Sequence, residues 1–148
     1  MRERSVVAVR PFDVSILVRQ SFSLAIIGNE QTGKSTFIKS LRPYLLKKPI
    51  VFDGGIQQHD GFQKHPTDLL VVSFEHHSFL LEENGFDFIV FLKETSIVAM
   101  YFLYERWFKP LAISRSCFLY MMDRYTDKYG ALILDVRNKT FFHIETIF

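Results

Sequence analysis

The sequence has a single cysteine, Cys117, among its 148 residues, so no disulfide can form within the chain. We expect Cys117 to be a buried core residue rather than a nucleophile, in a protein of a reducing compartment. No run of 18 apolar residues occurs, so no membrane span is predicted. The residues that follow Met1 include no long apolar stretch of the kind found in a signal peptide. We therefore expect a cytoplasmic protein that is not secreted.

The net charge is also small, since 18 basic and 16 acidic residues leave a net charge of +2. That value is too small to indicate nucleic-acid binding by itself. We find no internal repeat, no low-complexity segment, and no N-K-x-D motif of the kind that reads a guanine base. By contrast, 48% of the residues are hydrophobic and 16 of them are phenylalanine. This exceeds what a minimal core needs, so we expect some apolar surface to meet a partner.

The most informative stretch runs from residue 28 to residue 36 and contains the pattern G-x-x-x-x-G-K-[ST] of a phosphate-binding loop. An apolar run of strand length, 22–27, precedes it, and apolar residues at helical spacing follow it. Strand, glycine-containing turn and helix are what phosphate binding needs. The predicted nucleotide-binding residues are Gly28, Asn29, Glu30, Gln31, Thr32, Gly33, Lys34, Ser35 and Thr36.

The chemistry of such a loop follows from its backbone. The two glycines allow successive N–H groups to converge on one anion, and the positive end of the next helix points at the same place. Lys34 is expected to reach the β- and γ-phosphates, and the Ser35 hydroxyl to bind Mg²⁺. The alternative interpretation is an ordinary strand–helix turn with a solvated lysine.

The length is that of one domain, residues 1–148, large enough to bury a core. The expected elements are a short strand or extended arm at 5–9, strands at 22–27, 50–53, 69–74, 131–136 and 140–144, and helices at 36–42, 95–108 and 111–125. Residues 86–92 are strongly apolar and ambiguous between strand and helix. Thr95 or Ser96 is the expected N-cap of one helix, and Asn138 is expected to adopt the positive φ of a hairpin turn. The predicted fold class is α/β, a mostly parallel central sheet flanked by helices and closed by a C-terminal β-hairpin.

Hydrolysis also requires a carboxylate that holds the metal, placed at the end of an apolar strand. Asp53 is our first candidate because it ends a strand and precedes two glycines, and ligands bind at the carboxyl ends of parallel strands. Glu75 is the second, because it ends the most apolar strand. Asp135 is a third candidate, which its hairpin setting makes an edge or surface residue. Each could instead be a solvated carboxylate at a strand end.

The histidines and arginines indicate functional roles less clearly than the P-loop does. The histidines at 59, 65, 76 and 77 match no zinc-binding spacing and have no cysteine nearby, so we interpret them as polar loop residues. His76 or Ser73 could sense the γ-phosphate from the strand at 69–74. Arg115 and Arg137 are candidates for an arginine finger supplied to a neighbouring subunit.

Together, the P-loop with its flanks, the strand 67–74 and the closing run 127–142 resemble the viral genome-packaging ATPases of large DNA viruses. These are the poxvirus-type members of the FtsK–HerA superfamily of P-loop NTPases. In this resemblance, 67–74 corresponds to the sensor strand and 127–142 to the C-terminal hairpin. The resemblance implies an ATP- and Mg²⁺-dependent ring motor that drives double-stranded DNA into a capsid. It implies contacts to DNA phosphates without sequence preference, capsid proteins as partners, and a place in the host-cell cytoplasm or the virion.

The chain departs from that family in one respect. Family members are longer and have an acidic Walker B strand, usually with paired acids, between the P-loop helix and the sensor strand. Here either Asp53 serves that role in a shortened core, or the unit is missing.

Two other functions stay open at this point. A small P-loop kinase or phosphotransferase would need an arginine-rich lid, and the segment 54–66 contains no arginine. A degenerate structural protein would bind nucleotide without turnover.

Overall fold

The computed structural model describes residues 7–13, 15, 22–28, 34–45, 50–53, 69–74, 86–127 and 130–145. The strands among them are β1 (Val9–Pro11), β2 (Phe22–Ile27), β3 (Ile50–Asp53), β4 (Leu69–Phe74), β5 (Phe88–Phe91), β6 (Gly130–Asp135) and β7 (Thr140–Glu145). The helices are α1 (Lys34–Leu41), α3 (Ile97–Leu103) and α4 (Arg115–Tyr125), with the short segments η2 (Arg42–Tyr44), η3 (Tyr104–Phe108) and η4 (Lys109–Leu111).

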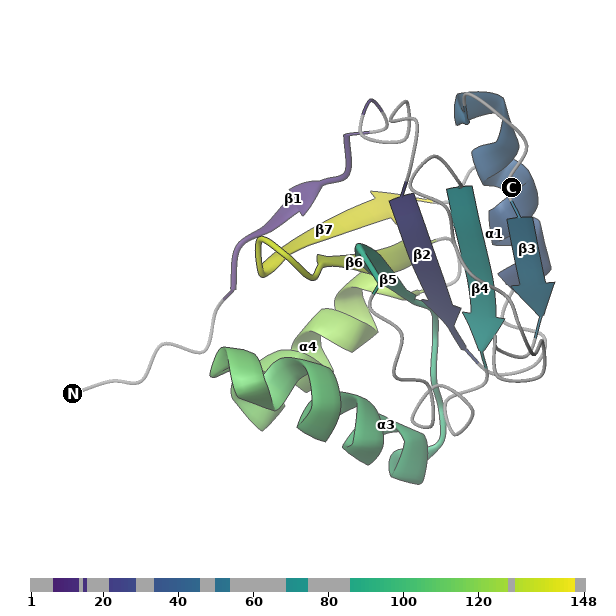
Figure 1. The fold of residues 1–148 in the computed structure, drawn as a ribbon. Coiled ribbons are helices and arrows are strands. Elements are labelled where there is room, and N and C mark those ends of the chain that lie inside the picture. The colour runs from purple at the N-terminus through teal and green to yellow at the C-terminus, as the bar shows by residue number, and fades with distance from the viewer. Residues whose placement is uncertain are drawn as a thin grey trace.

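The seven strands of the described residues form one sheet in the order β1-β7-β6-β5-β2-β4-β3 (Figure 1). β2 lies between β4 and β5 and is parallel to both, and β3 is parallel to β4. β6 is antiparallel to β5 and to β7, and β1 is parallel to β7. All strands except β6 therefore point the same way, which confirms the mostly parallel sheet and the C-terminal hairpin.

Both faces of the sheet are covered, because successive side chains of a strand point to opposite sides. On one face, Leu24 and Ile26 of β2 pack in a cluster with Phe37 and Leu41 of α1. On the other face, Ala25 and Ile27 belong to a cluster with side chains of α3, η3 and α4. In Figure 1, α3 and α4 accordingly lie together below the sheet, and α1 stands apart at the right. A strand buried on both sides is expected to be nearly continuously apolar, as β2 is apart from Ser23.

The helices α3 and α4 each begin at a serine. The Ser96 side chain accepts a hydrogen bond from the Ala99 N–H at 3.3 Å, and the Ser114 side chain accepts one from the Cys117 N–H at 3.1 Å. This confirms Ser96 as the N-cap of the first of these helices. The second begins at Arg115, four residues later than the predicted 111.

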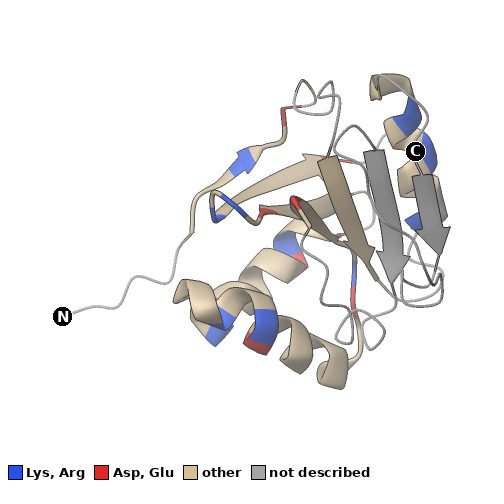
Figure 2. Cartoon of the chain, viewed as in Figure 1, with Lys and Arg blue, Asp and Glu red and all other residues tan. Residues whose placement is uncertain are grey.

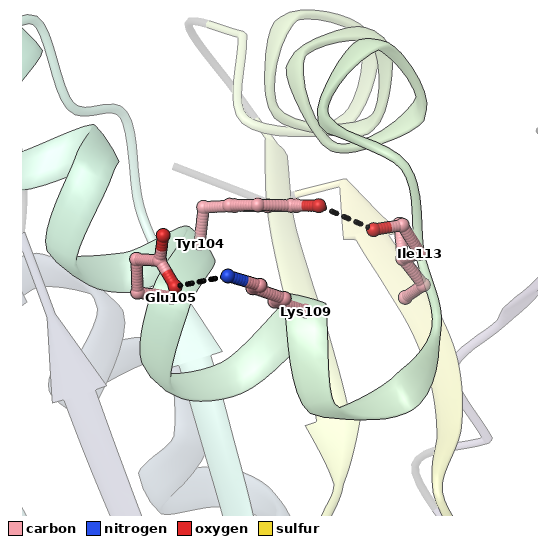
Figure 3. A network of polar contacts seen from close by, with 4 residues as sticks. All are labelled: Tyr104, Glu105, Lys109 and Ile113. Carbon is pink, nitrogen blue, oxygen red and sulfur yellow. Dashed lines mark hydrogen bonds and ion pairs between the residues drawn. The ribbon is translucent and has the colours of Figure 1, made fainter.

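The difference arises in the corner between α3 and α4. In Figure 1 the helical ribbon continues beyond the label α3. This continuation is the π-helical turn η3 and the 3-10 turn η4, which contains Pro110. Ala112 then adopts a positive φ of 61°. The Tyr104 hydroxyl donates to the Ile113 carbonyl at 2.8 Å, and Lys109 pairs with Glu105 at 3.2 Å (Figure 3). The chain thus turns before α4 begins.

Two expectations for the hairpin need correction. The positive φ in its turn belongs to Lys139, at 56°, rather than to Asn138. Asn138 instead donates its backbone and side-chain N–H groups to Asp135 at 3.1 and 2.8 Å. This contact holds Asp135 in a buried position, 8% exposed, so it is not a surface residue. The carboxylate of Asp135 organises the turn, since an aspartate commonly accepts from a nearby backbone N–H there.

Gly130 is the first residue of β6 and has no room for a side chain. A Cβ atom at this position would lie 2.5 Å from the carbonyl oxygen of Tyr125, a backbone atom that cannot turn aside. We expect Gly130→Ala to lower the free energy of unfolding by ~1–3 kcal/mol, the usual cost of overpacking. Urea unfolding measures this, with Ser116→Ala on the exposed side of α4 as a control expected to change little. An unchanged midpoint for Gly130→Ala would contradict the close approach.

Candidate functional site

The candidate site lies at the edge of the sheet where β2 ends. Ile27, the last residue of β2, is paired with Phe74 of β4 and with Phe91 of β5. These three parallel strands therefore end at the same edge. The backbone N–H of Leu92, just after β5, donates to the Ile27 carbonyl at 3.0 Å, so the chain after β5 also borders this point. Ligands of open α/β sheets bind at such an edge.

Gly28 and Lys34 are the described residues that border the predicted phosphate-binding loop. Gly28 follows β2 directly and is buried, and Lys34 is the first residue of α1. The Lys34 ammonium donates to the Gly28 carbonyl at 2.6 Å, so the side chain crosses the mouth of the loop. The strand and helix predicted on either side of the loop are both present. Residues 29–33 lie outside the described residues.

The remaining residues of the motif are in the first turn of α1. Ser35 is the second residue of the helix, and Thr36 follows with an exposed side chain. The side chain of Ser35 is outside the described part of the structure. The backbone nonetheless places Ser35 beside Lys34 at the start of the helix, where a helix N-terminus favours negative charge.

Asp53 is the last residue of β3, at the carboxyl edge of the sheet. Asp53 is paired with Ser73 of β4, and Ser73 is paired with Ile26 of β2. These three residues form a row across the sheet, and Asp53 is separated from the P-loop strand by one intervening strand. The spacing of adjacent strands puts its backbone roughly 10 Å from β2. Its side chain, like the whole of Glu75, is outside the described residues.

The structure separates Asp135 from this site. Asp135 is paired with Phe88, the first residue of β5, so it lies at the opposite edge of the sheet from the end of β2. Because antiparallel β6 ends where β5 begins, an apolar strand followed by an acid does not suffice to place that acid at the P-loop. The third metal candidate is therefore wrong.

Other candidate residues are placed as follows. Cys117 is 5% exposed, as predicted, and burial raises the pKa of its thiol, which opposes formation of a nucleophilic thiolate. Arg115 and Arg137 are exposed, on α4 and in the hairpin turn. The four loop histidines lie outside the described residues, within which no cluster of three potential metal-ligating side chains occurs. Within the same residues, no helix is long and apolar enough to cross a membrane.

Sequence reasoning missed Glu94, a buried acid at this edge. Glu94 is 8% exposed and follows β5 by three residues. Its carboxylate accepts from the backbone N–H groups of Thr95 and Ser96 at 3.0 and 3.1 Å. It thereby orders the turn between β5 and α3. An acid two residues before an N-cap serine was the available signal.

No protein-family model matches the chain, and no curated protein matches it. Among solved structures, it is similar to the genome packaging NTPase B204 from Sulfolobus turreted icosahedral virus 2 in complex with sulfate. The TM-score is 0.56 at 13% sequence identity, over 88% of this chain and 99% of that chain. The same NTPase in complex with ATP-gammaS gives a TM-score of 0.50 at 10% identity, over 88% and 100% of the two chains. This likeness, together with the order of the strands, shows that the chain has the α/β fold of a P-loop NTPase.

Proposed function

We propose that the chain is an ATP-binding P-loop ATPase of the viral genome-packaging type. The observation that carries the proposal is the mouth of the loop, where Lys34 begins α1 and reaches the carbonyl of Gly28 at the end of β2. The fold shared with a viral packaging NTPase supports it. Within such NTPases, the sensor-like sequence that includes β4 and the closing hairpin favour the poxvirus-type members of the FtsK–HerA superfamily.

Asp53 is the acid that we assign to the Walker B position. The resemblance requires that strand to come between the P-loop helix and the sensor strand in the sequence, and β3 comes between α1 and β4. In the sheet, β4 lies between β2 and β3. The chain is then a shortened P-loop core in which one acid, rather than a pair, ends the Walker B strand.

The donors at this edge fit Mg²⁺, which prefers hard oxygen ligands and keeps several waters. The Ser35 hydroxyl would hold it from the first turn of α1, and Asp53 would act from β3. A side chain must span the intervening strand, so we propose that Asp53 acts through a metal-bound water. When bound, Mg²⁺ neutralises the charge that develops on the transferred phosphoryl group. Residues 28–36 would bind the phosphates, with Lys34 as a catalytic residue.

The partners follow from the packaging type of function. We propose that the active form is a homo-oligomeric ring that contacts double-stranded DNA through its phosphates and acts with capsid proteins, in the host-cell cytoplasm or the virion. Because these contacts are electrostatic, stimulation by DNA should fall as the salt concentration rises.

ATP hydrolysis measured with and without double-stranded DNA tests the proposal. Turnover that DNA stimulates supports a packaging motor. Binding of Mg-ATP without turnover would favour the degenerate nucleotide-binding protein, and phosphate transfer to an acceptor would favour the kinase. Absence of both binding and turnover would refute a nucleotide-dependent function.

The assignment of the acid predicts a difference between two isosteric variants. We expect Asp53→Asn to lower the rate of hydrolysis roughly 100-fold by removing a charge at the metal, and Glu75→Gln to lower it less. The Mg²⁺ concentration needed for half-maximal activity should rise in Asp53→Asn only. Equal effects of the two variants would remove our ranking, and a larger effect of Glu75→Gln would reverse it.

A further inference from the structure

The outer face of α3 and α4 exposes an unusual amount of apolar side chain. The exposed fractions are 86% for Ile97, 61% for Val98, 52% for Tyr101, 39% for Phe102, 48% for Leu119 and 58% for Tyr120. We call these six residues the α3–α4 patch. Figure 2 shows no charged residue in α3 itself, and none occurs in its sequence, IVAMYFL. A solvent-facing helix normally has a polar outer side.

The two helices contribute to one continuous surface. A cavity of about 210 Å³ lies between them, and its lining includes Ile97 and Tyr101 of α3 and Arg115 and Leu119 of α4. A second cavity, of about 340 Å³, is also lined by Leu119 and extends to Asp123. Leu119 lines both cavities, so they are neighbours along α4, with Arg115 at the first and Asp123 at the second.

The size of the patch is that of an interface. With aromatic side chains of ~150–250 Å² each, the exposed fractions leave on the order of 500 Å² of largely apolar surface. The largest apolar patch of a typical monomer is ~300–600 Å². A standard interface buries ~800 Å² on each partner, including a polar rim. Together with the charged residues at its ends, the patch therefore approaches the surface area that a stable dimer buries on each subunit.

The charges along α4 indicate which partner fits. Arg115, Leu119 and Asp123 are spaced by four residues, so they lie on one ridge of the helix, and all three are exposed. The ridge has a cation at one end, a leucine in the middle and a carboxylate at the other end. A second copy packed antiparallel would bring Leu119 onto the two-fold axis. Arg115 would then face Asp123 of the partner subunit, and the reciprocal pair would form at the other end.

We propose that the chain forms a two-fold dimer in which the α3–α4 patch of one copy covers the same patch of the other. The patch belongs to the helices on one face of the sheet, and α1 packs on the opposite face. The contact is closed, since each copy uses the same surface. The dimer therefore does not depend on the proposed function.

Sedimentation velocity of the full chain over a wide concentration range tests the dimer. We expect a monomer–dimer equilibrium in which Leu119→Asp weakens association roughly tenfold or more, as expected for a residue at the centre of an interface. Ala8→Asp, an exposed position just before β1, is the matched control and should leave association unchanged. A monomer at all concentrations, including one that instead binds lipid vesicles, would overturn the proposal, as would a dimer insensitive to Leu119→Asp.

Exchanging the charges tests the two-fold arrangement. Arg115→Asp and Asp123→Arg should each weaken association roughly tenfold, because each places like charges opposite one another twice. The double variant should restore association to within roughly threefold of the parent. The Arg115 guanidinium also lies 5.8 Å from the centre of the Tyr104 ring, and Arg115→Asp and the double variant both remove this cation–π interaction. Rescue therefore reports on the pairing between copies, and its absence would refute the antiparallel arrangement.

Discussion

Replacing Lys34 by alanine is expected to lower ATP hydrolysis at least ~100-fold and to weaken ATP binding. Lys34 places a positive charge at the mouth of the loop, where its ammonium lies 2.6 Å from the Gly28 carbonyl. On binding, the ammonium would exchange this neutral acceptor for the β- and γ-phosphate oxygens. The anionic phosphate oxygens attract the ammonium more strongly than a neutral carbonyl does, so the exchange favours the nucleotide.

The matched control for this variant is Lys39→Ala. Lys39 lies in the last turn of α1 and is exposed, so its replacement removes the same charge from the same helix without altering the loop. The hydrolysis rate of this control should stay within roughly twofold of the parent. The affinity for nucleotide can be measured by calorimetry with a non-hydrolysable analogue. This measurement is possible even if the protein does not hydrolyse ATP. Equal rates and equal affinities in Lys34→Ala and the parent would refute the phosphate-binding loop.

Replacing Phe108 by alanine is expected to lower the free energy of unfolding by ~3–5 kcal/mol. Phe108 is fully buried at the end of η3, and its ring centre lies 4.5 Å from that of Phe118, 5.1 Å from Phe91 and 5.3 Å from Phe141. These rings come from α4, β5 and β7, so one side chain joins the helical layer to the sheet. The loss is a large part of the ~5–15 kcal/mol that stabilises a typical domain.

Urea unfolding measures this loss, at a protein concentration where the chain is monomeric. Phe102→Ala is the matched control, because Phe102 belongs to the same continuous helical stretch but is 39% exposed. It should lower the free energy of unfolding by less than ~1 kcal/mol. Similar losses in the two variants would mean that the cluster around Phe108 contributes little.

Local sequence was enough to locate the strands of the parallel part of the sheet. The runs 22–27, 50–53 and 69–74 were predicted with the bounds that the structure has. Each is short and nearly continuously apolar, which is the pattern expected of strands in a parallel sheet. The serine N-cap of α3 could also be predicted from the sequence, because a cap depends only on residues three positions apart.

Features that depend on distant partners were predicted less well. The strand β5 was ambiguous, and its identity comes from pairing with β2 and β6. The end of α3 and the start of α4 depend on the hydrogen bond from the Tyr104 hydroxyl to the Ile113 carbonyl. Asp135 lies beside the start of β5 because β6 is antiparallel to β5, and no local pattern encodes that direction.

For the candidate site, the sequence by itself determined the identity of the loop, because a phosphate-binding turn needs glycines and a lysine at fixed spacing. It also determined that a strand precedes this loop and that a helix follows it. Only the tertiary structure decided which acids share the edge of the sheet with the loop, since strand order and direction result from pairing between segments far apart in the chain. The same holds for the α3–α4 patch, because apolar residues within a helix face the core or the solvent according to what packs against them.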